Sequence, residues 1–371
     1  MTPIKYLYSG TVTLWILLAT LFVSACGMQS QETAVFRVNL ERTGMFPADG
    51  PAALNELVWK FRTDGPIFSS PVVANGVVYI GSWDASLYAI DSTTGQEVWR
   101  FNTGGEIFSS PMITDETVYI GSGDGHLYAI HAKTGQETWR FETEGEVFSA
   151  PAIVNGTAFV GSSDGHLYAV NIKTGQEVWR FETADEVFSS PAITGGVVYI
   201  ASKDGHLYAL DSATGQEKWR FSTNAEVFSS PAIANEVVYI GSNDGRLYAL
   251  DVKTGEEKWH FKTDGAVTSS PAIAGGVVCV GSNDGRLYAL DATTGQEKWH
   301  FKTDGEVASS PAIAGRVVYV GSNDGRLYAL DATTGEEKWR FKTGGPVASS
   351  PAIAGGVVYF SSLDGYLYAV R

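Results

Sequence analysis

Three histidines at a spacing of forty residues are the first candidates for chemistry: His126, His166 and His206. Imidazole is a common zinc ligand, and ligands about 2 Å from one zinc ion lie within about 4 Å of each other. If the forty-residue units form facing sheets, equivalent positions are about 10 Å apart. One ion cannot be shared by all three side chains, so we interpret these histidines as solvated turn residues.

Aspartates recur at the same spacing in front of a glycine or alanine, from Asp84 to Asp364. Carboxylates bind calcium, but Asp-Gly is also a turn sequence, and turn chemistry is our preferred explanation over a weak calcium role. The chain has only two cysteines, Cys26 and Cys279. Cys279 takes the place of the strand residues Tyr239 and Tyr319, which favours a small buried side chain over a reactive thiol. We find no arrangement of a nucleophile with a base.

The elements that position these residues repeat with a period of forty, as in GSNDGRLYALDATTGEEKWRFKT at 321–343. Within this unit, 317–320 is continuously apolar, as expected of a strand buried on both faces, and 326–330 follows an Asn-Asp-Gly turn. We expect both central residues of that turn to have positive φ. Residues 337–343 alternate between aromatic and charged side chains, which predicts a strand with one solvated face. A fourth, inner strand is predicted at 310–314, where small residues suit converging sheets.

Four short antiparallel strands repeated radially predict an all-β fold, an eight-bladed β-propeller. The repeats begin at residue 58 with an outer strand alone and end at residue 371 with three strands that lack an outer one. We therefore expect the N-terminal outer strand to close the ring. The predicted domains are a signal peptide at 1–25, a tether and non-repeat lead segment at 26–57, and the propeller at 58–371.

The pattern Ala-x-Asp-x-x-Thr-Gly-x-x-x-Trp, as at 209–219, 249–259, 289–299 and 329–339, resembles the tryptophan-docking motif of the pyrroloquinoline-quinone (PQQ)-like propeller repeats. The resemblance implies that each Trp ring lies between neighbouring blades and ties them together. These blade-docking residues are Trp59, Trp99, Trp139, Trp179, Trp219, Trp259, Trp299 and Trp339. His131 and Asn171 replace the motif Asp, and we expect looser joints there.

The same resemblance raises the question of an enzyme. Quinoprotein dehydrogenases of similar architecture hold PQQ between a Trp and two adjacent cysteines, with calcium beside it. This chain has no adjacent cysteines, and every repeat has the minimal length. We predict no catalytic, cofactor-binding or metal-binding residue; a PQQ- and calcium-dependent oxidoreductase, or another small-molecule-binding propeller, is the alternative.

The N-terminus resembles a bacterial lipoprotein signal: Lys5, an apolar run at 12–23, then Val-Ser-Ala-Cys. An uncleaved anchor is the alternative, but small residues end the run. By this resemblance Cys26 is lipidated and tethers the protein in the cell envelope, either at the outer membrane facing the periplasm or on the outer face of the cell membrane. Loss of 1–25 removes only one charged residue, Lys5, and leaves 25 basic and 41 acidic residues, a net charge of −16. Nucleic acid is therefore an unsuitable partner.

We expect residues 35–57 to run along the outside of the propeller.

The repeats differ most where the Asp-Gly turns and the links between blades meet, which we expect at one end of the disc. Five consecutive links carry Phe where the other three carry Thr268, Ala308 and Ala348. Trp83 lies there too, and we expect it to be mostly exposed. The candidate binding face is Phe68, Trp83, Phe108, Phe148, Phe188 and Phe228, with Glu106, Glu146, Glu186 and Glu226 as an acidic rim. An apolar arc with this rim fits a peptide or protein segment; the alternative is that Phe plugs the central channel.

These observations predict a lipid-anchored, non-enzymatic, monomeric scaffold that binds envelope proteins or peptide segments. The functional analogy is the propeller lipoprotein of the outer-membrane β-barrel assembly machinery, and it rests on the fold.

Overall fold

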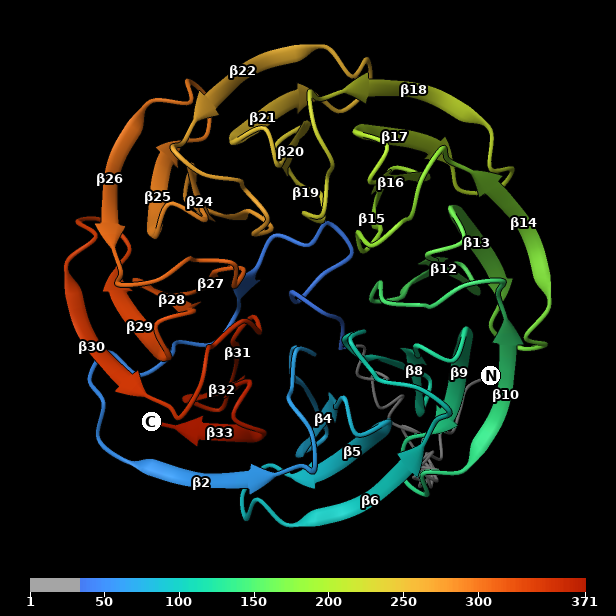
Figure 1. Cartoon of the computed structure of the whole chain (residues 1–371), viewed down its shortest axis with the longest axis horizontal. Coiled ribbons are helices and arrows are strands. Elements are labelled where there is room, and N and C mark those ends of the chain that lie inside the picture. Colours follow the sequence, from blue (N-terminus) through green and yellow to red (C-terminus); the bar gives the residue numbers. More distant parts are fainter. Residues whose placement is uncertain (1–33) are drawn as a thin grey trace, which may run out of the picture. The chain divides into compact units, whose positions relative to one another are not determined.

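The structure is a computed structural model that describes residues 34–371. These residues form eight blades of four antiparallel strands around one axis, a β-propeller, and the sheet of one blade carries a fifth, parallel strand (Figure 1). Seven blades consist of four consecutive strands, and the eighth joins β31, β32 and β33 to the N-terminal β2. In residues 34–371 no helix is long and apolar enough to cross a membrane.

Each blade begins with a three-residue inner strand next to the axis. The inner strands of blades 1 to 8 are β3 (Val72–Ala74), β7 (Met112–Thr114), β11 (Ala152–Val154), β15 (Ala192–Thr194), β19 (Ala232–Ala234), β23 (Ala272–Ala274), β27 (Ala312–Ala314) and β31 (Ala352–Ala354). Their small, buried residues fit the place where the blades converge, as predicted.

The second and third strands carry the core. The second strands are β4 (Val77–Gly81), β8 (Thr117–Gly121), β12 (Thr157–Gly161), β16 (Val197–Ala201), β20 (Val237–Gly241), β24 (Val277–Gly281), β28 (Val317–Ser322) and β32 (Val357–Ser361). The third strands are β5 (Ser86–Asp91), β9 (His126–His131), β13 (His166–Asn171), β17 (His206–Asp211), β21 (Arg246–Asp251), β25 (Arg286–Asp291), β29 (Arg326–Asp331) and β33 (Tyr366–Val370). Both kinds are buried on both faces, because each blade packs between two others.

The outer strands have one solvated face, as their alternating sequence predicts. They are β6 (Glu97–Asn102), β10 (Glu137–Glu142), β14 (Glu177–Glu182), β18 (Glu217–Ser222), β22 (Glu257–Lys262), β26 (Glu297–Lys302), β30 (Glu337–Lys342) and, in blade 8, β2 (Leu57–Arg62). The pairing of Trp59 with Ala369 and of Phe61 with Leu367 confirms that the N-terminal strand closes the ring.

The docking tryptophans join each blade to the next. The indole nitrogen of Trp219 donates to the carbonyl of Val252, 3.2 Å away in the following blade. Its ring packs on Gly255, where a Cβ would lie 2.5 Å from the ring, and Gly255 has φ +72°. Glycine is required there because it removes both the clash and the cost of positive φ.

The two joints without the motif Asp are not looser, so that expectation is wrong. The indole N–H groups of Trp99 and Trp139 donate to the carbonyls of Ala132 and Ile172, each at 2.8 Å. The acceptor is a main-chain carbonyl next to the replaced residue, and it does not depend on the replaced side chain. Asn171 also keeps the turn bonds of Asp, since its Oδ1 accepts from the backbone of Lys173 and Thr174.

We expected residues 35–57 to run along the outside of the propeller, and this is wrong for their first part, up to Phe46. Figure 1 shows this part of the lead segment, in blue, crossing the centre of the ring. Its carbonyls accept hydrogen bonds from the inner strands, and β1 (Met45–Phe46) pairs in parallel with β27. The free edges of the inner strands attract it, because their N–H and C=O groups point to the axis without partners from their own blades.

After β1 the lead segment passes to the rim and completes the joint between blades 7 and 8. In the seven other joints the tryptophan donates to the carbonyl 33 residues further on, and Trp339 has a different acceptor. The carbonyl of Pro51 takes this place and accepts from Trp339 and Tyr319, both at 2.9 Å.

Candidate functional site

The Asp-Gly turns and the links between blades lie at the same end of the propeller, as predicted. The backbone N–H of Gly104, in a link, donates to the carboxylate of Asp124 at 2.6 Å. The N–H of Gly123, in the turn, donates to the carbonyl of Glu106 at 2.8 Å. We call this end the mouth. One detail of the turn differs from expectation, because Gly325 alone has positive φ and Asp324 does not.

Aromatic side chains form a continuous arc around part of the mouth. Phe68 and Phe108 have ring centroids 5.2 Å apart, and Phe108 and Phe148 follow at 4.6 Å. Phe148 stacks on Phe188 at 5.4 Å, and Phe188 contacts Phe228 at 5.7 Å. The first four rings are half-buried and Phe228 is 36% exposed. The arc therefore presents apolar surface from five neighbouring links.

Trp83 belongs to this arc and is not mostly exposed, so that expectation is wrong. Its ring stacks on Phe68 at 4.6 Å and contacts Phe108 at 4.7 Å, which leaves it half-buried. Its indole N–H is shielded from solvent and has no hydrogen-bond partner within residues 34–371. A shielded donor without a partner is rare and calls for an acceptor.

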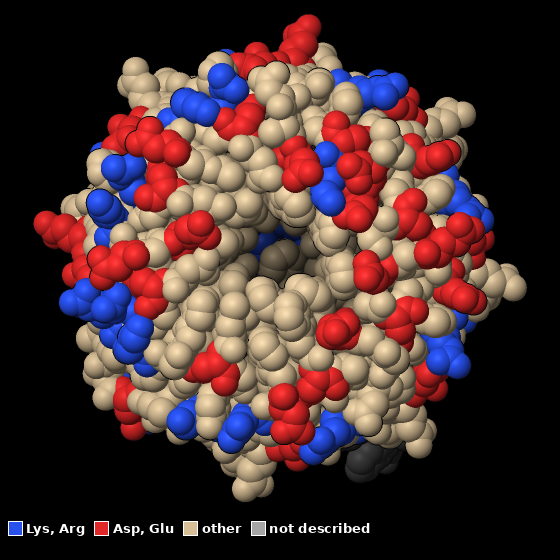
Figure 2. All heavy atoms as spheres, in the orientation of Figure 1, with Lys and Arg blue, Asp and Glu red and all other residues tan. Residues whose placement is uncertain are grey.

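Acidic side chains border the mouth on the outside. Figure 2 shows a hollow at the centre of the ring with Asp and Glu, in red, around it. Glu106, Glu146 and Glu226 are exposed. Glu186 is half-buried and forms an ion pair with Lys203 at 2.7 Å, and this lysine also lies 5.6 Å from the ring centre of Phe188. The aromatic arc and the acidic rim are thus neighbouring parts of one surface.

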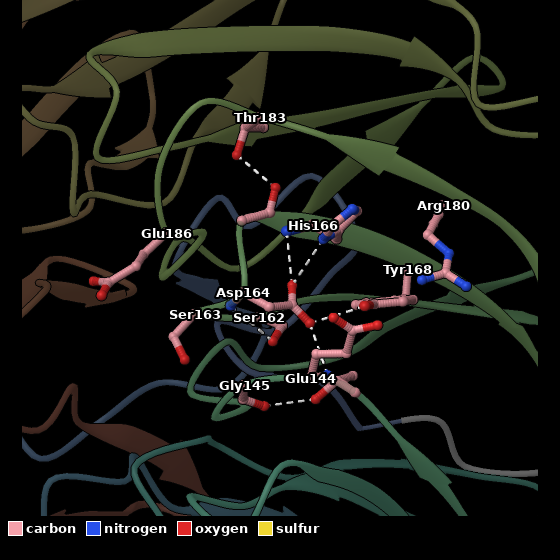
Figure 3. A network of polar contacts seen from close by, with 12 residues as sticks. Glu144, Gly145, Ser162, Ser163, Asp164, His166, Tyr168, Arg180, Thr183 and Glu186 are labelled. Carbon is pink, nitrogen blue, oxygen red and sulfur yellow. Dashed lines mark hydrogen bonds and ion pairs between the residues drawn. The ribbon is translucent and has the colours of Figure 1, made fainter.

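The recurring aspartates hold the mouth turns together, as Figure 3 shows for Asp164. Asp164 accepts from the hydroxyl of Tyr168 at 2.8 Å and from the backbone N–H groups of His166 and Glu144, both at 2.9 Å. Burial alone would raise the pKa of Asp164, but these hydrogen bonds outweigh it and hold the pKa below its usual value. The carboxylates are therefore occupied by turn chemistry.

The three histidines stay within their own blades. The Nδ1 atoms of His126, His166 and His206 lie 3.1, 3.1 and 3.2 Å from the carboxylates of Asp124, Asp164 and Asp204. They are half-buried against these aspartates, more shielded than the solvated residues we expected. Within the described part of the chain, no three His, Cys, Asp or Glu side chains are grouped to hold a metal ion.

Cys279 does not contribute to the mouth. Cys279 is buried in the core, and burial raises the pKa of its thiol to about 12, so it is a small apolar side chain as predicted. Cys26 and the signal peptide lie outside the described residues.

Two arginines on the axis were not among the residues predicted to matter. Arg42 donates to the carbonyls of Pro191, Phe36 and Ala150, at 2.5, 3.1 and 3.0 Å. Arg37 donates to the carbonyl of Pro271. Arg37, Val38 and Arg42 have φ of 61°, 79° and 53°, a strained conformation that surrounding contacts must impose. One feature of the sequence could have pointed to Arg37 and Arg42: both lie in a non-repeat segment that also carries apolar residues.

Comparisons with known proteins agree with this architecture. The family model described as outer membrane protein assembly factor BamB matches residues 51–113 and 284–371. The propeller model of the beta-alanine-activating enzyme matches residues 114–274. Among curated proteins no relative matches this chain.

Several solved structures share the fold. BamB from Moraxella catarrhalis has 22% identity and a TM-score of 0.75, covering 85% of this chain and 99% of its own. The computationally designed Ika8 protein has 21% identity and a TM-score of 0.78, covering 85% of this chain and 100% of its own. The quinohemoprotein alcohol dehydrogenase ADHIIG from Pseudomonas putida HK5 has 16% identity and a TM-score of 0.81, covering 91% and 79%.

The eight blades define a β-propeller, and its repeats and docking tryptophans resemble those of the PQQ-like propellers. Within this class, the chain resembles the outer membrane protein assembly factor BamB.

Proposed function

We propose that this protein is a non-enzymatic scaffold of the cell envelope that binds extended protein segments at its mouth, as in outer-membrane protein assembly. The observation that carries the proposal is the continuous arc of aromatic rings from Phe68 to Phe228. Aromatic side chains concentrate binding energy at protein interfaces, because they bury large areas at low entropic cost.

Two further features favour a polypeptide as the ligand. The shielded indole N–H of Trp83 lacks an acceptor, and a main-chain carbonyl is one that every peptide supplies. The exposed Glu106, Glu146 and Glu226 would attract basic side chains that flank an apolar segment. Lipidation of Cys26 would place this mouth at a membrane surface, at the outer membrane if the resemblance to BamB extends to location.

The alternative is a PQQ-dependent dehydrogenase, and the residues of this chain do not fit that cofactor. Its cysteines are Cys26 and Cys279, which are not adjacent. The mouth aspartates are taken up by Tyr and backbone donors, as at Asp164. The dehydrogenase ADHIIG shares the fold at 16% identity, and a shared fold does not specify chemistry.

The test is binding of a fluorescently labelled ten-residue peptide that alternates aromatic and basic residues, a pattern similar to that of a membrane β-barrel strand. We expect saturable binding, weakened at least about tenfold by Phe148→Ala or Phe188→Ala, since a central aromatic contributes about 2 kcal/mol. Val178→Ala is the matched control, because Val178 is 51% exposed on an outer strand. Absence of peptide binding, or equal binding by the Phe variants, contradicts the proposal. Oxidation of an alcohol after addition of PQQ and calcium would establish the alternative.

A further inference from the structure

The lead segment leaves one part of the axial channel open. Five inner strands donate the N–H of their middle residue to the lead segment: Ile113 to Ala34, Ile193 to Leu40, Ile233 to Glu41, Ile273 to Thr43 and Ile313 to Gly44. The equivalent residues of blades 1, 3 and 8 are Val73, Ile153 and Ile353. Within residues 34–371, none of the three donates to the lead segment. Blade 3 is instead contacted by Arg42, which donates to the carbonyl of Ala150, whereas the neighbouring blades 8 and 1 leave the opening.

A cavity of about 310 Å³ lies at this opening, with Val73, Ile353 and Arg37 in its wall. By the register shared with the other blades, the N–H groups of Val73 and Ile353 point to the axis. Since water occupies about 30 Å³ in the liquid, the space holds on the order of ten water molecules or one small solute. Ser70 and Ser350 add polar atoms to the wall.

Arg37 is the unusual member of this wall. Its side chain is 5% exposed, and one nitrogen donates to the carbonyl of Pro271. Its Nε and Nη1 are shielded from solvent and have no partner within residues 34–371. Arg42 differs, because all three of its nitrogens donate to main-chain carbonyls. Among the described residues no carboxylate forms an ion pair with either arginine.

Burying two guanidinium groups near one axis without an anion costs free energy. Burial lowers the pKa of Arg37 to about 9, and burial and then the charge of Arg37 lower that of Arg42 to about 9. A buried charge is normally paired, and a shielded donor without a partner indicates a missing ion or water. Basic atoms, in blue, are visible at the bottom of the axial hollow in Figure 2.

We propose that the axial cavity binds a small oxyanion, a carboxylate or a phosphate, with Arg37 as its charge partner and the N–H groups of Val73 and Ile353 as further donors. A planar guanidinium recognises both groups through paired hydrogen bonds. The site is independent of peptide binding at the mouth, because it is built by the lead segment and by the inner strands of blades 7, 8 and 1.

The test is calorimetric titration of the purified protein with inorganic phosphate, acetate or succinate at constant ionic strength, with potassium chloride as the reference salt. We expect saturable binding of phosphate or of a carboxylate, and the separate titrations identify which. A ligand bound by the folded protein alone also raises its melting temperature. Arg37→Gln should weaken the affinity about 10- to 100-fold, the value of a hydrogen-bonded charge.

Two further variants complete the design. Arg316→Gln removes an exposed arginine and should bind as wild type. Ala354→Leu narrows the cavity without touching a charge and should also abolish binding. The proposal is overturned if the wild type binds none of the three anions, or if either cavity variant retains wild-type affinity. If Arg37→Gln does not fold, the wild type and Ala354→Leu decide the question.

Discussion

The contact between Trp219 and Gly255 predicts a strong coupling between two substitutions in neighbouring blades. Gly255→Ala places a methyl group 2.5 Å from the Trp219 ring at a residue with φ +72°. Positive φ costs a non-glycine residue about 1 to 2 kcal/mol, and overpacking adds about 1 to 3 kcal/mol. We therefore expect Gly255→Ala to destabilise the protein by about 2 to 5 kcal/mol.

Gly275→Ala is the matched control, because it separates the backbone cost from the clash. Gly275 has φ +56°, and a Cβ there meets no atom within 4 Å. Gly275→Ala should therefore lower the free energy of unfolding by the backbone part alone, about 1 to 2 kcal/mol. Trp219→Ala removes the half-buried ring and should cost about 3 kcal/mol, the lower end for aromatic truncation.

In the double variant, loss of the ring also removes the clash. Gly255→Ala should then cost no more than Gly275→Ala, which gives a favourable coupling energy of about 1 to 3 kcal/mol. Guanidinium titrations of the four proteins of the cycle, with Gly275→Ala alongside, measure these values. Equal costs for the two glycine substitutions, or additive costs in the cycle, would refute the docking geometry.

Two other predictions concern closure of the ring and acid stability. Deletion of 34–62 removes β2 and should cause self-association through the exposed edge of β33. Deletion of 34–46 keeps β2 and Pro51 and should leave a monomer, and light scattering distinguishes the two variants. If the 34–62 deletion is monomeric with an unchanged melting temperature, closure of the ring by β2 is disproved. Because the folded-state pKa of Asp164 is lowered, its stabilising contribution is complete above the unfolded pKa of about 4 and is lost as pH falls through the lower folded value. The stability difference between wild type and Asp164→Asn should therefore shrink from pH 7 to pH 2, and a constant difference in denaturant titrations would contradict this reasoning.

The repeat pattern was sufficient for the blades because its signals are local. Alternation in 337–342 specified an outer strand, continuous apolar runs specified strands buried on both faces, and the solitary outer strand at 58–61 implied closure with β33. The spacing also placed Phe68 to Phe228 at one end, because a fixed period puts equivalent residues at equivalent positions.

The angle between blades was needed to show that these rings touch. Sequence position put Trp83 in a turn, where exposure is the ordinary expectation. Its burial follows from Phe68 and Phe108, which neighbouring links bring to within 4.7 Å of its ring. The identity of acceptors at the joints was also hidden, because a carbonyl such as that of Pro51 has no side-chain signature.

What the sequence by itself determined is the number, order and faces of the strands, since each is encoded within one repeat. Only the tertiary structure decided the path of the lead segment. That segment contacts inner strands far apart in sequence, and its partners are backbone groups such as the carbonyls of Pro191 and Pro271. Such groups become a binding surface only when eight blades bring their free inner edges around one axis, and this arrangement also buries Arg37 and Arg42.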